Sequence, residues 1–224
     1  ASRLITHPGK DAMPRVSSHH RLKTRHLAPH PQPNALPRVS SIRKKTDNMN
    51  GDPNLYQLLN ELEIPFEYHE HPPAPTIEEA MKYWKDLNAT HCKNLFFRNH
   101  KGNRHYLVIL EHTRQMGIHE LEKQLKQGKL SFASDQRMMK YLGVTPGSVT
   151  PFGLINDTDH HVHVFLDRNL LNSSTISFHP CINTASIIIQ WTDFLKFMLW
   201  TSNTFEYISL YNFNADEPSA NRIG

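Results

Sequence analysis

A chain of 224 residues, 38% hydrophobic and 21% charged, has room for one or two domains and the composition of a soluble protein. The net charge is +4, but residues 1–48 hold 10 Lys and Arg against two acidic residues, whereas residues 49–224 hold 15 against 19. The basic charge therefore belongs to the first segment, and the remainder is not a basic fold. The apolar runs are short and interrupted, which excludes a membrane-spanning helix.

Residues 1–48 are rich in Pro, His, Ser and Arg and lack apolar periodicity, so we predict a disordered basic extension ahead of one domain over residues 49–224. The extension could be a transit peptide, an RNA-attracting arm or a stretch translated upstream of a start at Met49. The third interpretation is favoured because patterned sequence begins directly afterwards. No secretory signal is apparent, and we expect a cytoplasmic protein.

The patterned region mixes helices and strands. Apolar spacing predicts five helices, over 53–62, 76–87, 118–126, 135–142 and 192–200. Four of them have a capping signal at their start, namely Asp52, Thr76, Ser134 and Thr192. Strands are predicted over 64–69, 93–98, 105–110, 161–166 and 183–189, with a hairpin turn at 101–103 and loops at 145–154 and 177–180. This order predicts an α/β or α+β fold with a mixed sheet.

Histidine and cysteine residues suggest a metal only weakly. Cys92 and Cys181 have no CxxC spacing and are expected to be free thiols. His160, His161 and His163 form a cluster in which the last two would share one face of a strand, but no third ligand stands at a recognised interval. We predict no metal site and no cofactor.

A few polar residues could form a catalytic site. Lys93 begins an apolar strand, where it could bind a phosphate, polarise an ester carbonyl or simply lie in solvent. His179 and Asn183 flank a proline-stiffened turn, and they could orient water or a ribose hydroxyl or merely satisfy the turn. The loop from Gly147 to Gly153 could admit a nucleotide or an aminoacyl group, or be a tight connection.

That loop lacks the spacing of a Walker A or dinucleotide-binding motif, so ATP and NAD are not supported. A Gly-x-Ser-x-Gly elbow and a Ser/His/Asp set are also missing from the sequence. These patterns exclude a serine-triad hydrolase.

A series of motifs in matching order and spacing resembles the prolyl-tRNA editing (YbaK/ProX-like) family, in particular its stand-alone Ala-tRNA(Pro) deacylases. The resemblance covers about residues 53–212. The segments that carry it are KNLFF at 93–97, RHYLV at 104–108, LSFAS at 130–134, YLGV at 141–144, PGSVTPFGL at 146–154, ND at 156–157, VFLDRNLL at 164–171, FHP at 178–180 and NTA at 183–185.

The resemblance implies a YbaK-like editing domain, a mixed curled sheet flanked by helices, that hydrolyses a wrong amino acid from the 3′ adenosine of tRNA(Pro). It places the family's essential lysine at Lys93 and its active-site histidine at His179, with Asn183 beside it. The substrate's own ribose hydroxyl takes part, so no dedicated nucleophile is needed. The substrate-binding residues implied are Asn94, Ser131, Gly147, Thr150, Phe152 and Gly153. The implied partners are the acceptor end of mischarged tRNA(Pro) and prolyl-tRNA synthetase, with no membrane.

The sequence departs from the family at a few positions, and alternatives remain. Residues 89–92 replace a usual glycine, Phe97 replaces an aliphatic residue, and Ser186 and Ile187 stand where a threonine pair is common. These changes leave open a Cys-tRNA(Pro) deacylase. A non-catalytic module that binds tRNA or a synthetase is the alternative from another class, and a metal hydrolase built on the histidine cluster is a third.

Overall fold

An eight-stranded mixed sheet forms the centre of the computed structural model, which describes residues 49–114 and 117–210. The strand order is β1-β7-β6-β2-β3-β5-β8, and β4 pairs with β2 beside this path. The strands are β1 (Glu67–Glu70), β2 (Thr90–Asn99), β3 (His105–Glu111), β4 (Leu130–Phe132), β5 (Val162–Asp167), β6 (Thr175–Phe178), β7 (Ala185–Gln190) and β8 (Phe205–Ile208). The extension over residues 1–48, with its predicted disorder, lies outside the described residues.

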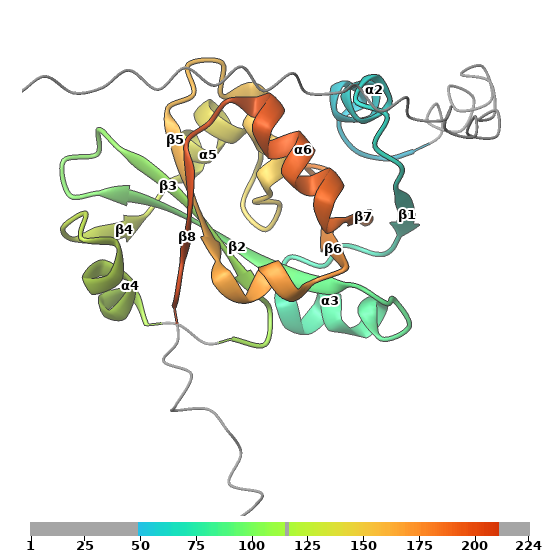
Figure 1. Ribbon diagram of the computed structural model, residues 1–224, viewed down its shortest axis with the longest axis horizontal. Helices are drawn as coiled ribbons and strands as arrows, with labels where there is room; N and C mark the ends of the chain where they lie inside the picture. The colour runs from blue at the N-terminus through green and yellow to red at the C-terminus, as the bar shows by residue number, and fades with distance from the viewer. Residues whose placement is uncertain (1–48, 115–116, 211–224) are drawn as a thin grey trace, which may run out of the picture. The chain divides into compact units, whose positions relative to one another are not determined.

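Helices cover both faces of the sheet (Figure 1). The main core packs α2 (Pro53–Glu61), α5 (Asp135–Leu142) and α6 (Trp191–Thr201) against one face. The other face carries α4 (Ile118–Leu125), through Leu121 and Leu125, and α3 (Ile77–Trp84), through Ala80 and Trp84. Two 3-10 helices, η1 (Pro151–Asn156) and η2 (Arg168–Asn172), complete the fold. A mixed α/β fold, as predicted, is therefore confirmed.

The helix ends follow the sequence signals with one exception. Asp52 accepts a hydrogen bond from the Asn54 amide at 2.9 Å, and Thr76 with Glu79 forms both bonds of the predicted capping box. Ser134 stands at the N-cap of α5, whose bounds are those predicted, but its side chain makes no cap hydrogen bond. The prediction for Thr192 was wrong, because α6 begins one residue earlier, at Trp191.

Short elements escaped the sequence analysis. β4 and β8 hold three and four residues, too few to show an alternating pattern. The predicted loop at 177–180 is in part β6, whose residues alternate between the main core and the opposite face. The loop at 145–154 runs into η1, which opens after Thr150 because Pro151 presets a helical φ angle.

Strand β2 changes its neighbour along its length. Its first residues, Thr90 and His91, pair in parallel with β6, and its last, from Phe97 to Asn99, pair with β4. From Cys92 to Arg98, β2 pairs with β3 in the predicted hairpin. Between the two partners, residues 92–95 leave one strand edge without a ladder, so the sheet opens there.

A directed hydrogen-bond chain closes the far end of β2 and β3. Arg137 Nη1 donates to His105 Nε2 at 2.7 Å, and His105 Nδ1 lies 2.9 Å from His161 Nε2. A guanidinium only donates, so His105 Nε2 accepts and the proton of the neutral ring lies on Nδ1. Nδ1 therefore donates a hydrogen bond to His161 Nε2. Burial, and then the charge of Arg137, lowers the pKa of His105 to about 4, which keeps this ring neutral.

The prediction that His161 and His163 share one face of a strand was wrong. β5 begins only at Val162, so His161 precedes the strand and stacks on Tyr141 of α5. His163 lies on the opposite side, within hydrogen-bond distance of Thr204 and beside Phe165. The two rings therefore point to different faces.

Candidate active site

Lys93 and His179 lie at the same level of the sheet, where it opens. His91 of β2 pairs with Ser177 of β6, and the two strands run parallel at a spacing of about 4.8 Å. Lys93 follows His91 by two residues within β2, and His179 follows Ser177 by two residues, directly after the end of β6. Ligands of open sheets bind where parallel strands end and their neighbours diverge, and this position fits that rule.

Asn94 ties this opening to the glycine-containing loop. Its side-chain Nδ2 donates to the Val149 carbonyl at 3.0 Å, while its buried Oδ1 has no partner among the described residues. Gly147 has φ +81, and a methyl group there would lie 3.1 Å from Pro75 Cβ. The loop therefore lies directly against Pro75. The Asn94 amide is fixed by its hydrogen bond, and its Oδ1 remains available as an acceptor.

The turn after β6 fixes the orientation of His179. Its Nδ1 lies 2.9 Å from the Ala185 carbonyl oxygen, which only accepts, so Nδ1 carries the proton. Nε2 of the neutral ring is then an acceptor. Burial lowers the pKa of His179 below its ordinary 6.5, and His71 adds to the effect, so the ring is neutral at pH 7.

Residues 183–185 hold a second segment against this turn. The amides of His71 and Ala74 donate at 2.9 Å to the Thr184 and Asn183 carbonyls. Asn183 follows His179 by four residues, and its carbonyl accepts the Ala74 amide; a catalytic role for its side chain stays a prediction.

Lys93 is partly desolvated. Burial lowers the pKa of its ammonium below 10.5, and Glu78 at the start of α3 opposes the shift. The ammonium therefore sits in a less polar setting than water. A cation in such a setting interacts more strongly with developing negative charge than one in water.

The remaining predicted substrate residues are not brought to this place. Thr150 and Phe152 are fully buried; Thr150 caps η1, and Phe152 packs edge-on to Phe178 and Phe197 in the main core. A methyl group on Gly153 would lie 2.6 Å from the Leu142 carbonyl oxygen, so this glycine allows η1 to pack on α5. Their predicted contact with substrate stays untested.

Ser131 lies at the other end of β2. It pairs with Arg98, five residues beyond Lys93, which corresponds to about 16 Å along the strand. Its side chain is exposed on the short strand β4. Lys93 therefore lies near the end of β2 that pairs with β6, and Ser131 lies near the opposite end.

Comparison with known proteins identifies the fold and the family. The family model of the aminoacyl-tRNA editing domain matches residues 71–197. The chain belongs to the aminoacyl-tRNA editing domain family. It is 39% identical over 152 residues to the prolyl-tRNA editing protein ProX of Acetoanaerobium sticklandii, covering 68% of this chain and 93% of that protein. It is 37% identical over 153 residues to the prolyl-tRNA synthetase associated domain-containing protein 1 of Mus musculus, covering 66% and 90%.

A solved structure, that of the hypothetical protein APE2540, shares the fold with a TM-score of 0.52 and 14% identity, covering 68% of this chain and 96% of that one. Family membership confirms the resemblance found in the sequence and the YbaK-like fold that it implied. Editing is the hydrolysis of aminoacyl-tRNA, so the predicted enzyme class, an aminoacyl-tRNA deacylase, is confirmed as well.

In this editing domain the sequence analysis missed four residues beside the site. His71, Tyr83, Trp84 and Ser186 form a contiguous aromatic and polar group next to His179. Their one signal in the sequence was the dipeptide of Tyr83 and Trp84 in a helix, whose partners lie on strands far away in the chain.

Two further features of the editing domain bear on earlier expectations. Among residues 49–114 and 117–210, no three His, Cys, Asp or Glu side chains gather as metal ligands. In the same ranges, every helix is too short or too polar to cross a membrane. Cys92 and Cys181 are both free, and burial raises the pKa of the Cys92 thiol far above the ordinary value, as expected of an inert side chain.

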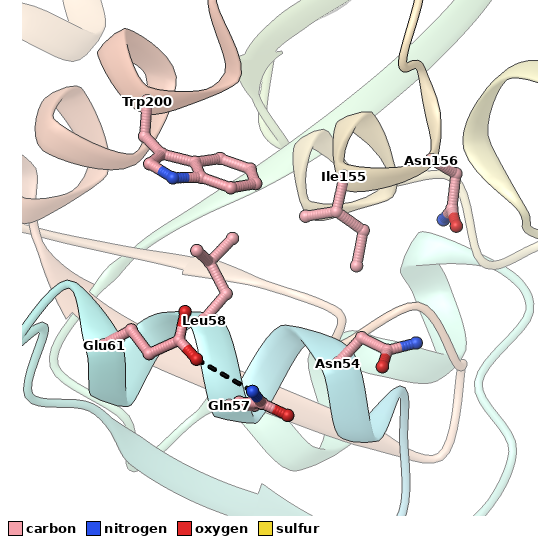
Figure 2. A pocket seen from close by; sticks show the side chains of 7 residues that line it. All are labelled: Asn54, Gln57, Leu58, Glu61, Ile155, Asn156 and Trp200. Atoms are coloured by element: carbon pink, nitrogen blue, oxygen red, sulfur yellow. Dashed lines mark hydrogen bonds between the residues drawn. The ribbon is translucent and has the colours of Figure 1, made fainter.

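A surface groove of about 290 Å³ lies apart from these residues, between α2, η1 and α6 (Figure 2). Trp200 and Ile155 face Leu58 across it, and Glu61 accepts a hydrogen bond from Gln57 along one wall. None of the predicted site residues lines this groove.

Proposed function

We propose that this protein hydrolyses the ester of mischarged tRNA(Pro), with Ala-tRNA(Pro) as the preferred substrate. The observation that carries the proposal is the register of β2 and β6, in which Lys93 and His179 each follow a residue of the pair His91 and Ser177 by two positions. The relatives named for prolyl-tRNA editing and for association with prolyl-tRNA synthetase support the choice of tRNA. A proline pocket cannot strongly reject the smaller alanine, since missing methylenes change binding by only about 1–3 kcal/mol.

Each residue has a role in this reaction that follows from its surroundings. The Lys93 ammonium stabilises negative charge that develops on the ester oxygen as a water molecule attacks the carbonyl carbon. Nε2 of His179 accepts a hydrogen bond from the attacking water or from the free ribose hydroxyl. The carbon–oxygen ester bond then breaks, and the tRNA 3′ oxygen leaves with a proton. Substrate binding by Asn94 is implied by the family resemblance alone, because alternation along β2 puts Asn94 on the main-core face and Lys93 on the other.

Recognition is confined to the acceptor end of the tRNA in this proposal. The net charge of residues 49–224 is −4, so this region cannot attract the phosphate backbone over a long surface. Association with prolyl-tRNA synthetase, and a cytoplasmic location with it, would bring the enzyme to newly mischarged tRNA.

The direct test is hydrolysis of Ala-tRNA(Pro), Cys-tRNA(Pro) and Pro-tRNA(Pro) by the purified protein, each compared with the rate without enzyme. We expect rapid loss of alanine and little loss of proline. Preferential loss of cysteine would replace the proposed substrate by its sister, and no loss from any of the three would contradict a catalytic function on tRNA(Pro).

The pH profile of hydrolysis tests the role of His179. Protonation removes the Nε2 lone pair, so kcat/KM will fall in acid with a midpoint below pH 6.5, because the pKa of His179 is lowered. It will fall again in alkali with a midpoint below 10.5, as Lys93 loses its proton. The measurement is kcat/KM across pH, corrected for uncatalysed hydrolysis. An unchanged acid limb in His179→Asn would show that another group titrates.

A further inference from the structure

A row of three aromatic rings leads away from the candidate catalytic residues. The His71 ring, at the end of β1, lies edge-on to His179 with centroids 6.1 Å apart. Tyr83 of α3 lies almost parallel to His71, at 5.2 Å and an interplanar angle of 8°. The order from the ester position outward is therefore His179, His71 and Tyr83.

The middle ring of this row is rigidly held. His71 Nδ1 lies 2.8 Å from the Pro72 carbonyl oxygen, which only accepts, so Nδ1 donates to it. Ser186 Oγ lies 3.1 Å from His71 Nε2 and 3.3 Å from Trp84 Nε1. An indole only donates, so the Ser186 hydroxyl accepts from Trp84 and links that ring to His71.

Burial reinforces this arrangement. His71 and Ser186 are 7% and 1% exposed, and the Trp84 ring stacks on His91 at 4.3 Å. The hydrogen-bond chain joins α3 to β7 and β1, so it fixes both the plane of His71 and the position of the helix that carries Tyr83. A surface that is rigid before binding costs little entropy when a ligand stacks on it.

Tyr83 itself is only half covered. One face of its ring is stacked on His71, and the residue is 38% exposed. An exposed aromatic face is a surface on which a single-stranded nucleic-acid base can stack.

We propose that the exposed face of Tyr83 stacks on the nucleobase of the nucleotide whose ribose carries the ester, a role that rests on the proposed function. The ribose separates the base from the ester carbon, and His71 separates Tyr83 from His179 in the same way. The ligand class is a nucleobase, and the ring contributes binding and not bond cleavage. Tyr83 and its support, Ser186, are thus positioning residues.

Steady-state kinetics of Tyr83→Ala tests this role. Loss of one stacked base lowers affinity by about 5-fold to about 150-fold, so KM for Ala-tRNA(Pro) will rise by that factor while kcat stays near the original value. Tyr83→Phe keeps the ring and will keep KM. Met81→Ala is the matched control, because Met81 is also exposed on α3 and has no place in the row. Equal KM values for Tyr83→Ala and Met81→Ala would overturn the proposal.

A binding experiment separates this proposal from the proposed function. Adenosine 5′-monophosphate and ribose 5-phosphate are titrated into the protein, with Trp84 fluorescence and amide chemical shifts of α3 as signals. We expect the nucleotide to bind more tightly than the sugar phosphate, and Tyr83→Ala to abolish the difference. This result would support the stacking surface even if no aminoacyl-tRNA were hydrolysed. Equal binding of the nucleotide by the original protein and Tyr83→Ala, or no binding by either, would overturn it.

Discussion

Lys93→Ala will reduce hydrolysis of Ala-tRNA(Pro) by about 100-fold to about 1,000-fold, the usual cost of removing one group that stabilises charge in a transition state. The loss will appear chiefly in kcat, because the ammonium meets full negative charge only as the carbonyl is attacked. Single-turnover hydrolysis with excess enzyme measures this step without interference from product release.

The control for this variant is Lys101→Ala, which removes the same charge from the exposed hairpin turn between β2 and β3. Lys93→Arg keeps the charge with a different shape and should recover only part of the rate. Urea unfolding of each variant separates lost chemistry from lost folding. Full activity of a folded Lys93→Ala protein would remove this lysine from the mechanism.

Phe152→Ala will destabilise the protein by about 3–5 kcal/mol, the cost of emptying a large buried aromatic site. The ring is fully buried and packs edge-on to Phe178 at 5.7 Å and to Phe197 at 5.2 Å. The free energy of unfolding in urea measures the effect. Phe152→Leu should restore much of the stability because it refills most of the cavity.

The stability and substrate preference of Phe152→Ala together show whether Phe152 acts in the core or in the substrate pocket of the editing domain. Phe132→Ala is the matched control, since Phe132 is 61% exposed on β4 and should cost far less stability. If Phe152→Ala kept its unfolding midpoint and changed the preference among aminoacyl groups, the ring would belong to the substrate pocket, as the sequence alone predicted.

Local signals predicted the local elements well. The capping box of Thr76 and Glu79 and the left-handed glycine at Gly143 define helix ends through contacts within a few residues, which a sequence displays directly. The hairpin of β2 and β3 is equally local. Strands β4, β6 and β8 depend on partners elsewhere in the chain, and three or four residues carry too little pattern to reveal them.

The candidate site shows the same difference between local signals and long-range contacts. Lys93, His179 and Asn183 were identified from a family resemblance that spans the motifs, and the register of β2 and β6 puts the first two at equivalent positions beyond the pair of His91 and Ser177. The loop of Gly147 to Gly153 read as one functional segment, although its second half turns into the core at η1. His71, Tyr83 and Ser186 share no sequence motif. They lie far apart in the chain, and the antiparallel pairing of β1 with β7 brings the first strand end close to Ser186.

The change of neighbour along β2 has a consequence for folding. The hairpin that carries Lys93 needs only contacts close in sequence, which form early and fast. His179 reaches Lys93 only when Thr90 and His91 pair with Ile176 and Ser177, a closure of a long chain loop that pays its entropy late. During refolding, the return of hydrolytic activity should therefore lag behind the formation of the hairpin and report the final long-range assembly of the sheet.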